Sequence, residues 1–168
     1  MRQAARDCAT LIPGAADVAQ TLQARGVKIG SCTGYSREMM ADILPLAREQ
    51  GYVPDCLVCA GETPAGRPSP LMVWKNLVEL GIWPADACAK VDDTEVGIAE
   101  GRAAGVWTVG VVRSGNLVGL SDADLAALPD DDCEARLATA KDRLLAAGAD
   151  CVIDTVADLQ QALDALRN

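Results

Sequence analysis

Short apolar runs alternate along the chain with longer segments in which apolar residues recur at helical spacing. The runs that we expect to form strands are 27–32, 56–60, 87–91, 106–112 and 151–153. The segments that we expect to form helices are 15–25, 36–50, 71–80, 94–104, 133–147 and 155–167. Strands that alternate with helices indicate a parallel sheet covered on both faces. The pattern therefore predicts an α/β fold with a Rossmann-like parallel sheet, and we interpret residues 1–168 as one domain.

The ends and faces of the predicted helices follow from their residue types. Ser36 and Thr94 suit helix N-caps, and Gly105 suits the stop after a helix. Pro45 is expected to kink or interrupt the helix that contains it. For two helices the spacing also predicts the buried face. The residues of these faces are Leu71, Trp74, Leu77 and Val78 in the first, and Leu137, Ala140, Leu144 and Leu145 in the second.

Composition narrows the classes of partner and chemistry. The net charge of −9 disfavours nucleic acid and anionic membrane surfaces, because both attract clustered Lys and Arg. The chain has no His, so the Ser-His-Asp triad, the Cys-His pair and His-ligated zinc are excluded. No apolar stretch has the length of a signal-peptide core or of a membrane span. The seven cysteines, an odd number, then favour a reduced, cytoplasmic compartment.

Two of the cysteines, Cys56 and Cys59, form a CxxC pattern. Redox pairs of this kind usually open a helix, and zinc ribbons need a second pair at a suitable distance. Here the pattern lies in a strand-like run and has no such second pair. A buried strand is the favoured interpretation, and a metal or redox site is the alternative.

Two carboxylates stand where the strand 87–91 gives way to the helix 94–104. Asp92 and Asp93 would lie at the carboxyl end of the sheet, where open α/β sheets bind ligands. Carboxylate oxygens suit Mg²⁺, which takes one or two of them and fills its other positions with water and phosphate. A solvated acidic turn followed by a helix cap is the alternative for this pair.

Three loops that each follow a strand are expected at the same edge of the sheet. Thr33 and the Gly34 amide, after the first strand, can donate to phosphoryl oxygens. Arg67, after the second, can make a bidentate contact, and Asp93, after the third, can hold a cation. Taken singly, these residues also suit a simple turn, a solvated loop and a cap. Together they predict a site for a small-molecule phosphate or phosphonate, with Mg²⁺ as the cofactor.

The chain resembles the phosphonoacetaldehyde hydrolase family of the haloacid dehalogenase superfamily in four segments. They read GSCTGYSREMM, PAGRPSP, KVDDTEVGIAEGRAAGVWTVGV and SGN, and the resemblance extends from about residue 11 to the C-terminus. It implies Mg²⁺-dependent hydrolysis of the P–C bond of phosphonoacetaldehyde to acetaldehyde and phosphate. By position, Thr33 and Gly34 match the family's phosphoryl-binding strand end. Arg67 matches its phosphate-orienting cation, and Asp93 matches its Mg²⁺ ligand.

The chain also departs from the family pattern. Family members begin with a strand that carries an aspartate nucleophile in a DxAGT-type motif, and a helical cap domain then supplies a Schiff-base lysine. Neither feature has a match here, so we expect a truncated core domain that is inactive as this chain alone. Asp92 stands where the family often has Gly, and Gly97 stands where some relatives have Asp.

The resemblance places the unmatched strand between the strands 27–32 and 87–91. Without it, each of these two strands would lack a neighbour, and their backbone N–H and C=O groups would be unpaired. Exposed strand edges of this kind pair with other chains. We therefore expect self-association, for example a homodimer through the unpaired sheet edges.

Two main functional hypotheses follow. The first is a phosphonoacetaldehyde hydrolase represented by a truncated chain. The alternative is a non-catalytic phosphate- or Mg²⁺-binding module or remnant that acts only with another chain. A receiver domain is a weaker third hypothesis, because its acidic pair should follow the first strand rather than the third.

Overall fold

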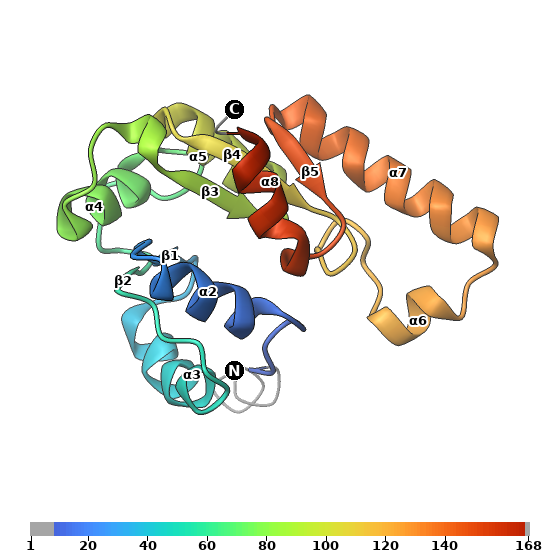
Figure 1. Ribbon diagram of the computed structural model, residues 1–168, viewed down its shortest axis with the longest axis horizontal. Coiled ribbons are helices and arrows are strands. Elements are labelled where there is room, and N and C mark those ends of the chain that lie inside the picture. The colour runs from blue at the N-terminus through green and yellow to red at the C-terminus, as the bar shows by residue number, and fades with distance from the viewer. Residues whose placement is uncertain (1–8, 167–168) are drawn as a thin grey trace.

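The computed structural model describes residues 9–166 and has the alternating order of strands and helices that the sequence predicts (Figure 1). The strands are β1 (Gly30–Cys32), β2 (Cys56–Val58), β3 (Ala89–Asp92), β4 (Trp107–Val111) and β5 (Cys151–Ile153). The α-helices are α2 (Ala15–Ala24), α3 (Arg37–Glu49), α4 (Leu71–Leu80), α5 (Glu95–Ala104), α6 (Asp122–Ala126), α7 (Asp130–Ala147) and α8 (Leu159–Leu166). Short 3₁₀ helices, η1 (Ala85–Ala87) and η2 (Val156–Asp158), precede β3 and α8. The fold is α/β, as predicted, and α6 is a helix that the sequence pattern did not predict.

The strands form two parallel sheets. β1 pairs with β2, and β4 pairs with both β3 and β5. No ladder among the described residues joins β1 to β3, which agrees with the expectation that these two strands lack a common neighbour. α4 packs against β1, β2 and α5, so it connects the two sheets (Figure 1).

Most of the core surrounds the three-stranded sheet. On one face, Ile98 of α5 and Leu144 of α7 belong to a single buried cluster. On the other face, Leu22 of α2 and Leu159 of α8 pack in a cluster with Val109 of β4. Helices therefore cover this sheet on both sides, as expected for parallel strands. None of the helices in residues 9–166 combines the length and the apolarity needed to cross a membrane.

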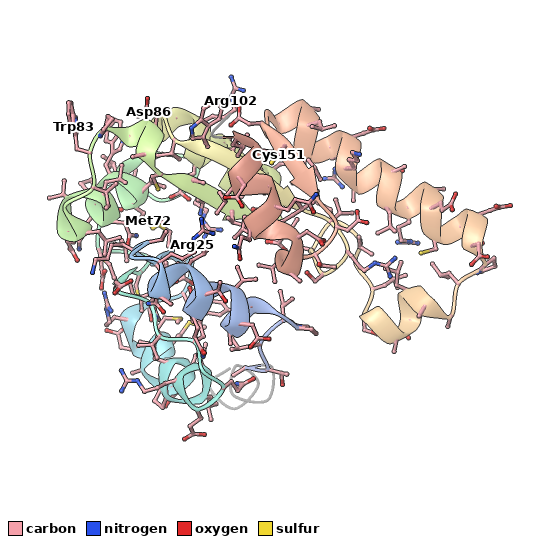
Figure 2. The ribbon with its side chains drawn as sticks, viewed as in Figure 1. Arg25, Met72, Trp83, Asp86, Arg102 and Cys151 are labelled. Carbon is pink, nitrogen blue, oxygen red and sulfur yellow. The ribbon has the colours of Figure 1, made fainter. Side chains whose placement is uncertain are left out.

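Helix α4 forms as predicted, but it buries only part of the predicted face. Its buried residues are Met72, Val73, Asn76 and Leu77. Trp74 and Val78 are instead 46% and 81% exposed, and Trp83, just after the helix, points away from the molecule (Figure 2). Leu77 is buried as predicted, but the expectation is wrong for Trp74 and Val78. α4 meets β1 through Asn76, whose Nδ2 donates to the Ser31 carbonyl at 3.1 Å, and this turns Trp74 and Val78 outward.

Two other expectations about helices are wrong in part. α3 runs through Pro45 without a break. Pro45 is on the exposed side of that helix, where water can reach the carbonyl that loses its donor. In α7, Leu144 is fully buried as predicted, but Leu145 is 43% exposed.

The CxxC pair lies in and just after β2, and both thiols are buried, as the strand interpretation predicts. The Cys56 Sγ lies 3.2 Å from Glu79 Oε2 and donates to it. Burial, helped by this carboxylate, raises the pKa of Cys56 to about 11, and burial also raises the pKa of Cys59. Neither thiol is therefore activated as a thiolate. Cys8 lies outside the described residues.

Candidate functional site

Arg67 is the predicted site residue that joins the ends of two strands. It lies in the loop after β2, and its Nη2 donates to the carbonyl of Cys32, the last residue of β1, at 2.7 Å. Its Nη1 lies 3.7 Å from Oδ2 of Asp92, the last residue of β3. The structure thus brings the loop after β2 to the carboxyl ends of β1 and β3.

Thr33 and Gly34 begin the loop that follows β1. The Thr33 amide donates to the Val58 carbonyl at 3.0 Å, and the Thr33 hydroxyl oxygen accepts from the Tyr35 amide at 3.1 Å. Gly34 is exposed, and a Cβ built on it would meet nothing within 4 Å. Among the described residues, no acceptor engages the Gly34 amide. A ligand could therefore accept from that amide and from the Thr33 hydroxyl, but not from the Thr33 amide.

Asp93 is held in place by the segment that follows β4. Its Oδ2 accepts from the Asn116 amide at 2.8 Å. Gly115 lets this segment pass close to Asp93, since a Cβ there would lie 3.0 Å from the Asp93 Cβ and 2.7 Å from the Val111 carbonyl oxygen. No described residue makes a hydrogen bond or ion pair with the other carboxylate oxygen, Oδ1. Asp93 is thus oriented by one oxygen while the second remains open.

Asp92 supports the start of α5. Its Oδ1 accepts from the Thr94 amide at 3.0 Å and from the Thr94 hydroxyl at 2.7 Å, and that hydroxyl oxygen accepts from the Gly97 amide at 3.1 Å. Burial alone would raise the pKa of Asp92, but the Lys90 ammonium and the Thr94 hydroxyl outweigh it and lower that pKa. The predicted Thr94 cap is confirmed. A solvated turn is wrong for Asp92, whose side chain is only 7% exposed.

Four charged side chains form a compact group around Arg67. We refer to Arg67, Lys90, Asp92 and Glu100 as the charge quartet. Lys90 Nζ lies 3.0 Å from both Asp92 Oδ2 and Glu100 Oε2, and Arg67 Nε lies 3.3 Å from Glu100 Oε2. Glu100 is fully buried, and no donor among the described residues makes a well-formed hydrogen bond to it. Two positive and two negative charges therefore balance one another around the buried Glu100, as buried charges require, while Arg67 keeps part of its side chain exposed.

Lys90, Glu100 and Asn116 take part in the site although the sequence analysis assigned them no role. Lys90 lies two residues before Asp92 in β3, so the two side chains share one face of the strand. Glu100 lies on the buried face of α5. For Lys90 and Glu100, the sequence did offer a sign of a role in the site. Each is a charged residue at a position of predicted burial, and such residues are almost never buried without a partner of opposite charge. Nothing in the spacing marks Asn116, because its contact depends on the path of a loop.

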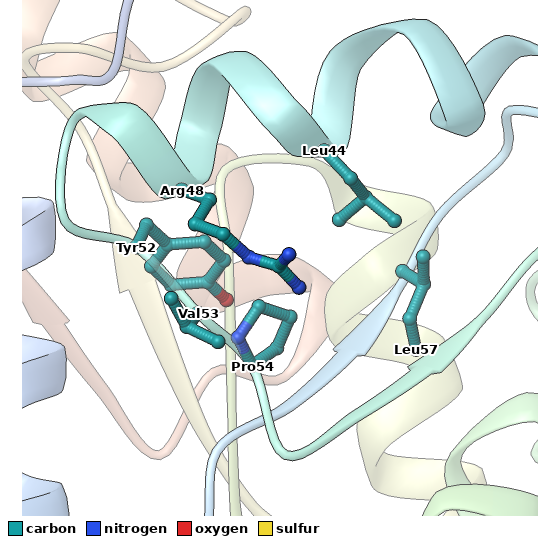
Figure 3. Close-up of a pocket in the computed structure, with 6 residues that line it drawn as sticks. All are labelled: Leu44, Arg48, Tyr52, Val53, Pro54 and Leu57. Carbon is teal, nitrogen blue, oxygen red and sulfur yellow. The ribbon is translucent and has the colours of Figure 1, made fainter.

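A surface pocket lies apart from these residues (Figure 3). It is lined by Leu44, Arg48, Tyr52, Val53, Pro54 and Leu57, from α3, the loop that follows it and β2. Figure 3 shows Arg48 extending from α3 toward Pro54. None of the four predicted site residues lines this pocket, so it is separate from the predicted phosphate site.

The residues present fit a hard cation. Mg²⁺ usually takes one or two carboxylates and completes its shell with water and substrate phosphate. Asp93 offers one carboxylate with an open oxygen. Within residues 9–166 no group of three or more Cys, Asp or Glu is placed to hold a metal. A cation here would therefore depend on Asp93 together with water and phosphate.

Comparison with known proteins identifies similar sequences. A family model described as a haloacid dehalogenase-like hydrolase matches residues 2–105. A phosphonoacetaldehyde hydrolase of Paraburkholderia phytofirmans is 53% identical over 150 residues, which are 89% of this chain and 56% of that protein. Another, of Nitratidesulfovibrio vulgaris, is 45% identical over 155 residues, which are 92% of this chain and 55% of that protein. The chain thus spans little more than half the length of these curated relatives.

Solved structures share the fold. A phosphonoacetaldehyde hydrolase-like protein from Oleispira antarctica superposes with a TM-score of 0.95 at 44% identity, covering 98% of this chain and 60% of that one. A hydrolase from Pseudomonas syringae superposes with a TM-score of 0.66 over 92% of this chain and 62% of that one. At 20% identity the second likeness concerns the fold alone.

Proposed function

Because the chain belongs to the haloacid dehalogenase-like hydrolase family, we propose that it forms the core of a phosphonoacetaldehyde hydrolase and binds the phosphonate group of the substrate. The observation that carries this proposal is the position of Arg67, paired to Cys32 and Asp92 at the ends of β1 and β3. The names of the curated relatives and of the Oleispira antarctica structure support it. The overall reaction would consume water and phosphonoacetaldehyde and release acetaldehyde and phosphate.

Each predicted residue would meet a different part of the phosphonate. Arg67 would donate charge-assisted hydrogen bonds to its oxygens. The Thr33 hydroxyl and the Gly34 amide would donate further hydrogen bonds from the β1 side. Asp93 would hold Mg²⁺, which when bound would neutralise charge on the phosphoryl group. The Asn116 amide would keep the Asp93 carboxylate oriented for that purpose.

The covalent steps are assigned to no residue of this chain. The aspartate nucleophile and the Schiff-base lysine that the family resemblance implies find no match in residues 1–168. In the alternative function, the chain is a phosphate- or Mg²⁺-binding module that acts with another polypeptide. That alternative is favoured by β1 and β3, each of which pairs on one side only among the described strands. The six free cysteines described suit a cytoplasmic protein in either case.

Isothermal titration calorimetry with inorganic phosphate in Mg²⁺ buffer tests the proposal. Arg67→Ala should weaken binding by about 1.5–3 kcal/mol, the usual contribution of a hydrogen bond to a charged group. Asp93→Asn should remove the dependence of phosphate binding on Mg²⁺. Both effects concern affinity, so they are measurable whether or not this chain alone is catalytic.

Matched control variants separate these effects from general charge effects. Arg48→Ala removes an arginine from the separate pocket, and Asp131→Asn removes an exposed carboxylate from α7. Both should bind phosphate as the unmodified protein does. Unchanged isotherms for both Arg67→Ala and Asp93→Asn would refute the proposed site.

A further inference from the structure

The Asp92 carboxylate occupies the space beside Gly97. A Cβ built on Gly97 would overlap the Asp92 carboxylate, meeting its Cγ and both of its oxygens. Asp92 therefore lies where a side chain at position 97 would otherwise start. Gly97 is in the first turns of α5 and has an ordinary helical backbone, so its left-handed freedom is not needed there. The reason for glycine at this position is room for the carboxylate.

The two oxygens of Asp92 face two different groups. Oδ1 receives the Thr94 amide and hydroxyl, which begin α5. Oδ2 lies 3.0 Å from Lys90 Nζ and 3.7 Å from Arg67 Nη1. Capping of α5 uses only Oδ1. Oδ2 is therefore available for the contacts with Lys90 and Arg67. The carboxylate thus connects the hydrogen-bonded start of α5 to the guanidinium of the loop after β2.

The remaining contacts of Arg67 do not fix it by themselves. Nη2 has one good hydrogen bond, to the Cys32 carbonyl, whereas Nε is buried without a well-formed hydrogen bond although Glu100 Oε2 is 3.3 Å away. Arg67 belongs to an irregular loop, and its side chain carries rotamer freedom that must be removed before it can bind a ligand in one geometry.

We propose that Asp92 is a positioning residue that holds Arg67 at the phosphate site, and that position 97 is glycine because the Asp92 carboxylate fills the space beside it. The proposal rests on the proposed function, in which Arg67 binds phosphate. Asp92 does not touch the ligand and acts through Arg67. Lys90 Nζ lies 3.0 Å from the same carboxylate oxygen.

A double-mutant cycle measured by calorimetry with phosphate in Mg²⁺ buffer tests this role. Asp92→Asn keeps the shape of the side chain and should weaken phosphate binding about tenfold. In the Arg67→Ala background the same substitution should change affinity less than about twofold, because the residue through which it acts is absent. Glu95→Gln, which removes an exposed carboxylate of the same helix that pairs with Arg143, is the control and should have no effect.

The mobility of the Arg67 side chain is a second measurement. It would not change if Asp92 only stabilised the fold. The ¹⁵N relaxation of the Arg67 Nε should report greater mobility in Asp92→Asn than in the unmodified protein, at equal helix content. Gly97→Ala, which displaces the carboxylate without removing it, should reproduce both effects. In an Asp92→Gly background, Gly97→Ala should become tolerated, with a melting midpoint above that of Gly97→Ala alone.

The outcomes distinguish the two proposals. If Arg67→Ala leaves phosphate binding unchanged, the proposed function fails, and the relaxation of Arg67 still decides whether Asp92 positions it. If Arg67→Ala weakens binding but Asp92→Asn has no effect, or adds fully to Arg67→Ala, the positioning role is overturned. Should Asp92→Asn not fold, Gly97→Ala takes its place in the cycle. If Gly97→Ala lowers the melting midpoint equally in the unmodified and the Asp92→Gly backgrounds, the Asp92 carboxylate is not the reason for glycine at position 97.

Discussion

At the scale of single residues, the charge quartet brings together side chains of β3, α5 and the loop after β2. Removing water from Glu100 costs free energy, and Lys90 and Arg67 offset that cost only by their close approach. Replacing such a group by apolar residues is often neutral, whereas losing one member leaves an uncompensated buried charge. The presence of the group is therefore weak evidence of stability, whereas removal of one member is expected to destabilise the protein.

Glu62 is expected to make the stability of the protein depend on pH. Arg37 donates to both of its carboxylate oxygens, at 2.6 and 2.8 Å, and the Cys59 amide donates at 3.0 Å. These hydrogen bonds, that of Arg37 first, lower the pKa of Glu62 from 4.5 to about 2. Because the folded carboxyl has the lower pKa, the interaction stabilises the protein fully above the unfolded value of 4.5. The contribution is lost as the pH falls toward 2.

Glu62→Gln should therefore lower the free energy of unfolding at pH 7 by roughly 1 kcal/mol, since the ion pair is partly exposed. At pH 3 the loss should be clearly smaller. Urea denaturation at the two pH values measures both, and Glu134→Gln, exposed in α7, serves as the control. A loss of the same size at both pH values would contradict this account of Glu62.

At the scale of elements, α7 packs against β4, β5 and α5, and Leu144 is its fully buried leucine. Leu144 is fully buried in the cluster that contains Ile98 of α5, and it lies against Gly110 of β4, where a Cβ would come within 3.0 Å of its Cδ1. Leu145 points about 100° away around the helix and is 43% exposed. Two neighbouring leucines thus make very different contributions to the same helix.

Leu144→Ala should destabilise the protein by about 2–5 kcal/mol, the cost of deleting a fully buried leucine side chain. Leu145→Ala is the matched control, because it makes the same change of helix propensity at an exposed position, and it should cost less than about 1 kcal/mol. Urea denaturation of both variants gives the comparison. Similar losses for the two would mean that α7 does not dock through Leu144.

At the scale of the whole molecule, the division into two sheets leaves β1 and β3 paired on one side only among the described strands. Unpaired strand edges template pairing with other chains, and buried backbone groups without partners cost about 1–3 kcal/mol each. We predict self-association of this chain, for example as a homodimer, or low stability. Size-exclusion chromatography with light scattering measures whether the chain associates, and thermal unfolding measures its stability. A sharp monomer peak with cooperative unfolding at an ordinary mesophile midpoint would show that the prediction is wrong.

The chain alone is expected not to hydrolyse phosphonoacetaldehyde. It has residues that suit phosphate and Mg²⁺, but no match to the nucleophile or to the Schiff-base lysine of the family. Loss of any member of such a catalytic set usually removes most of the rate. An assay that couples acetaldehyde release to a dehydrogenase, run with Mg²⁺, measures this. Metal-dependent turnover that Asp93→Ala abolishes would refute the prediction.

The sequence by itself determined most of the strands and helices, although α6 was not predicted, and it determined where the helices begin. The caps at Ser36 and Thr94 formed as predicted, since capping depends on residues within one turn of the helix. The loops after β1 and β2 were expected at one edge of the sheet, because parallel strands present their carboxyl ends there, and Arg67 Nη2 donates to the Cys32 carbonyl at that edge. These predictions rest on local chemistry and on the direction of the strands, both of which can be read from one sequence.

Only the tertiary structure decided which face of α4 is buried and what each site residue contacts. The apolar residues of α4 offered two faces, and the choice that exposes Trp74 depends on where β1 lies. Likewise, the Asn116 amide reaches Asp93 from 23 residues away, and Asp92 and Gly97 share a space that neither position reveals alone. The physical reason is that burial and charge pairing depend on neighbours distant in sequence, whose positions are set only when the elements pack.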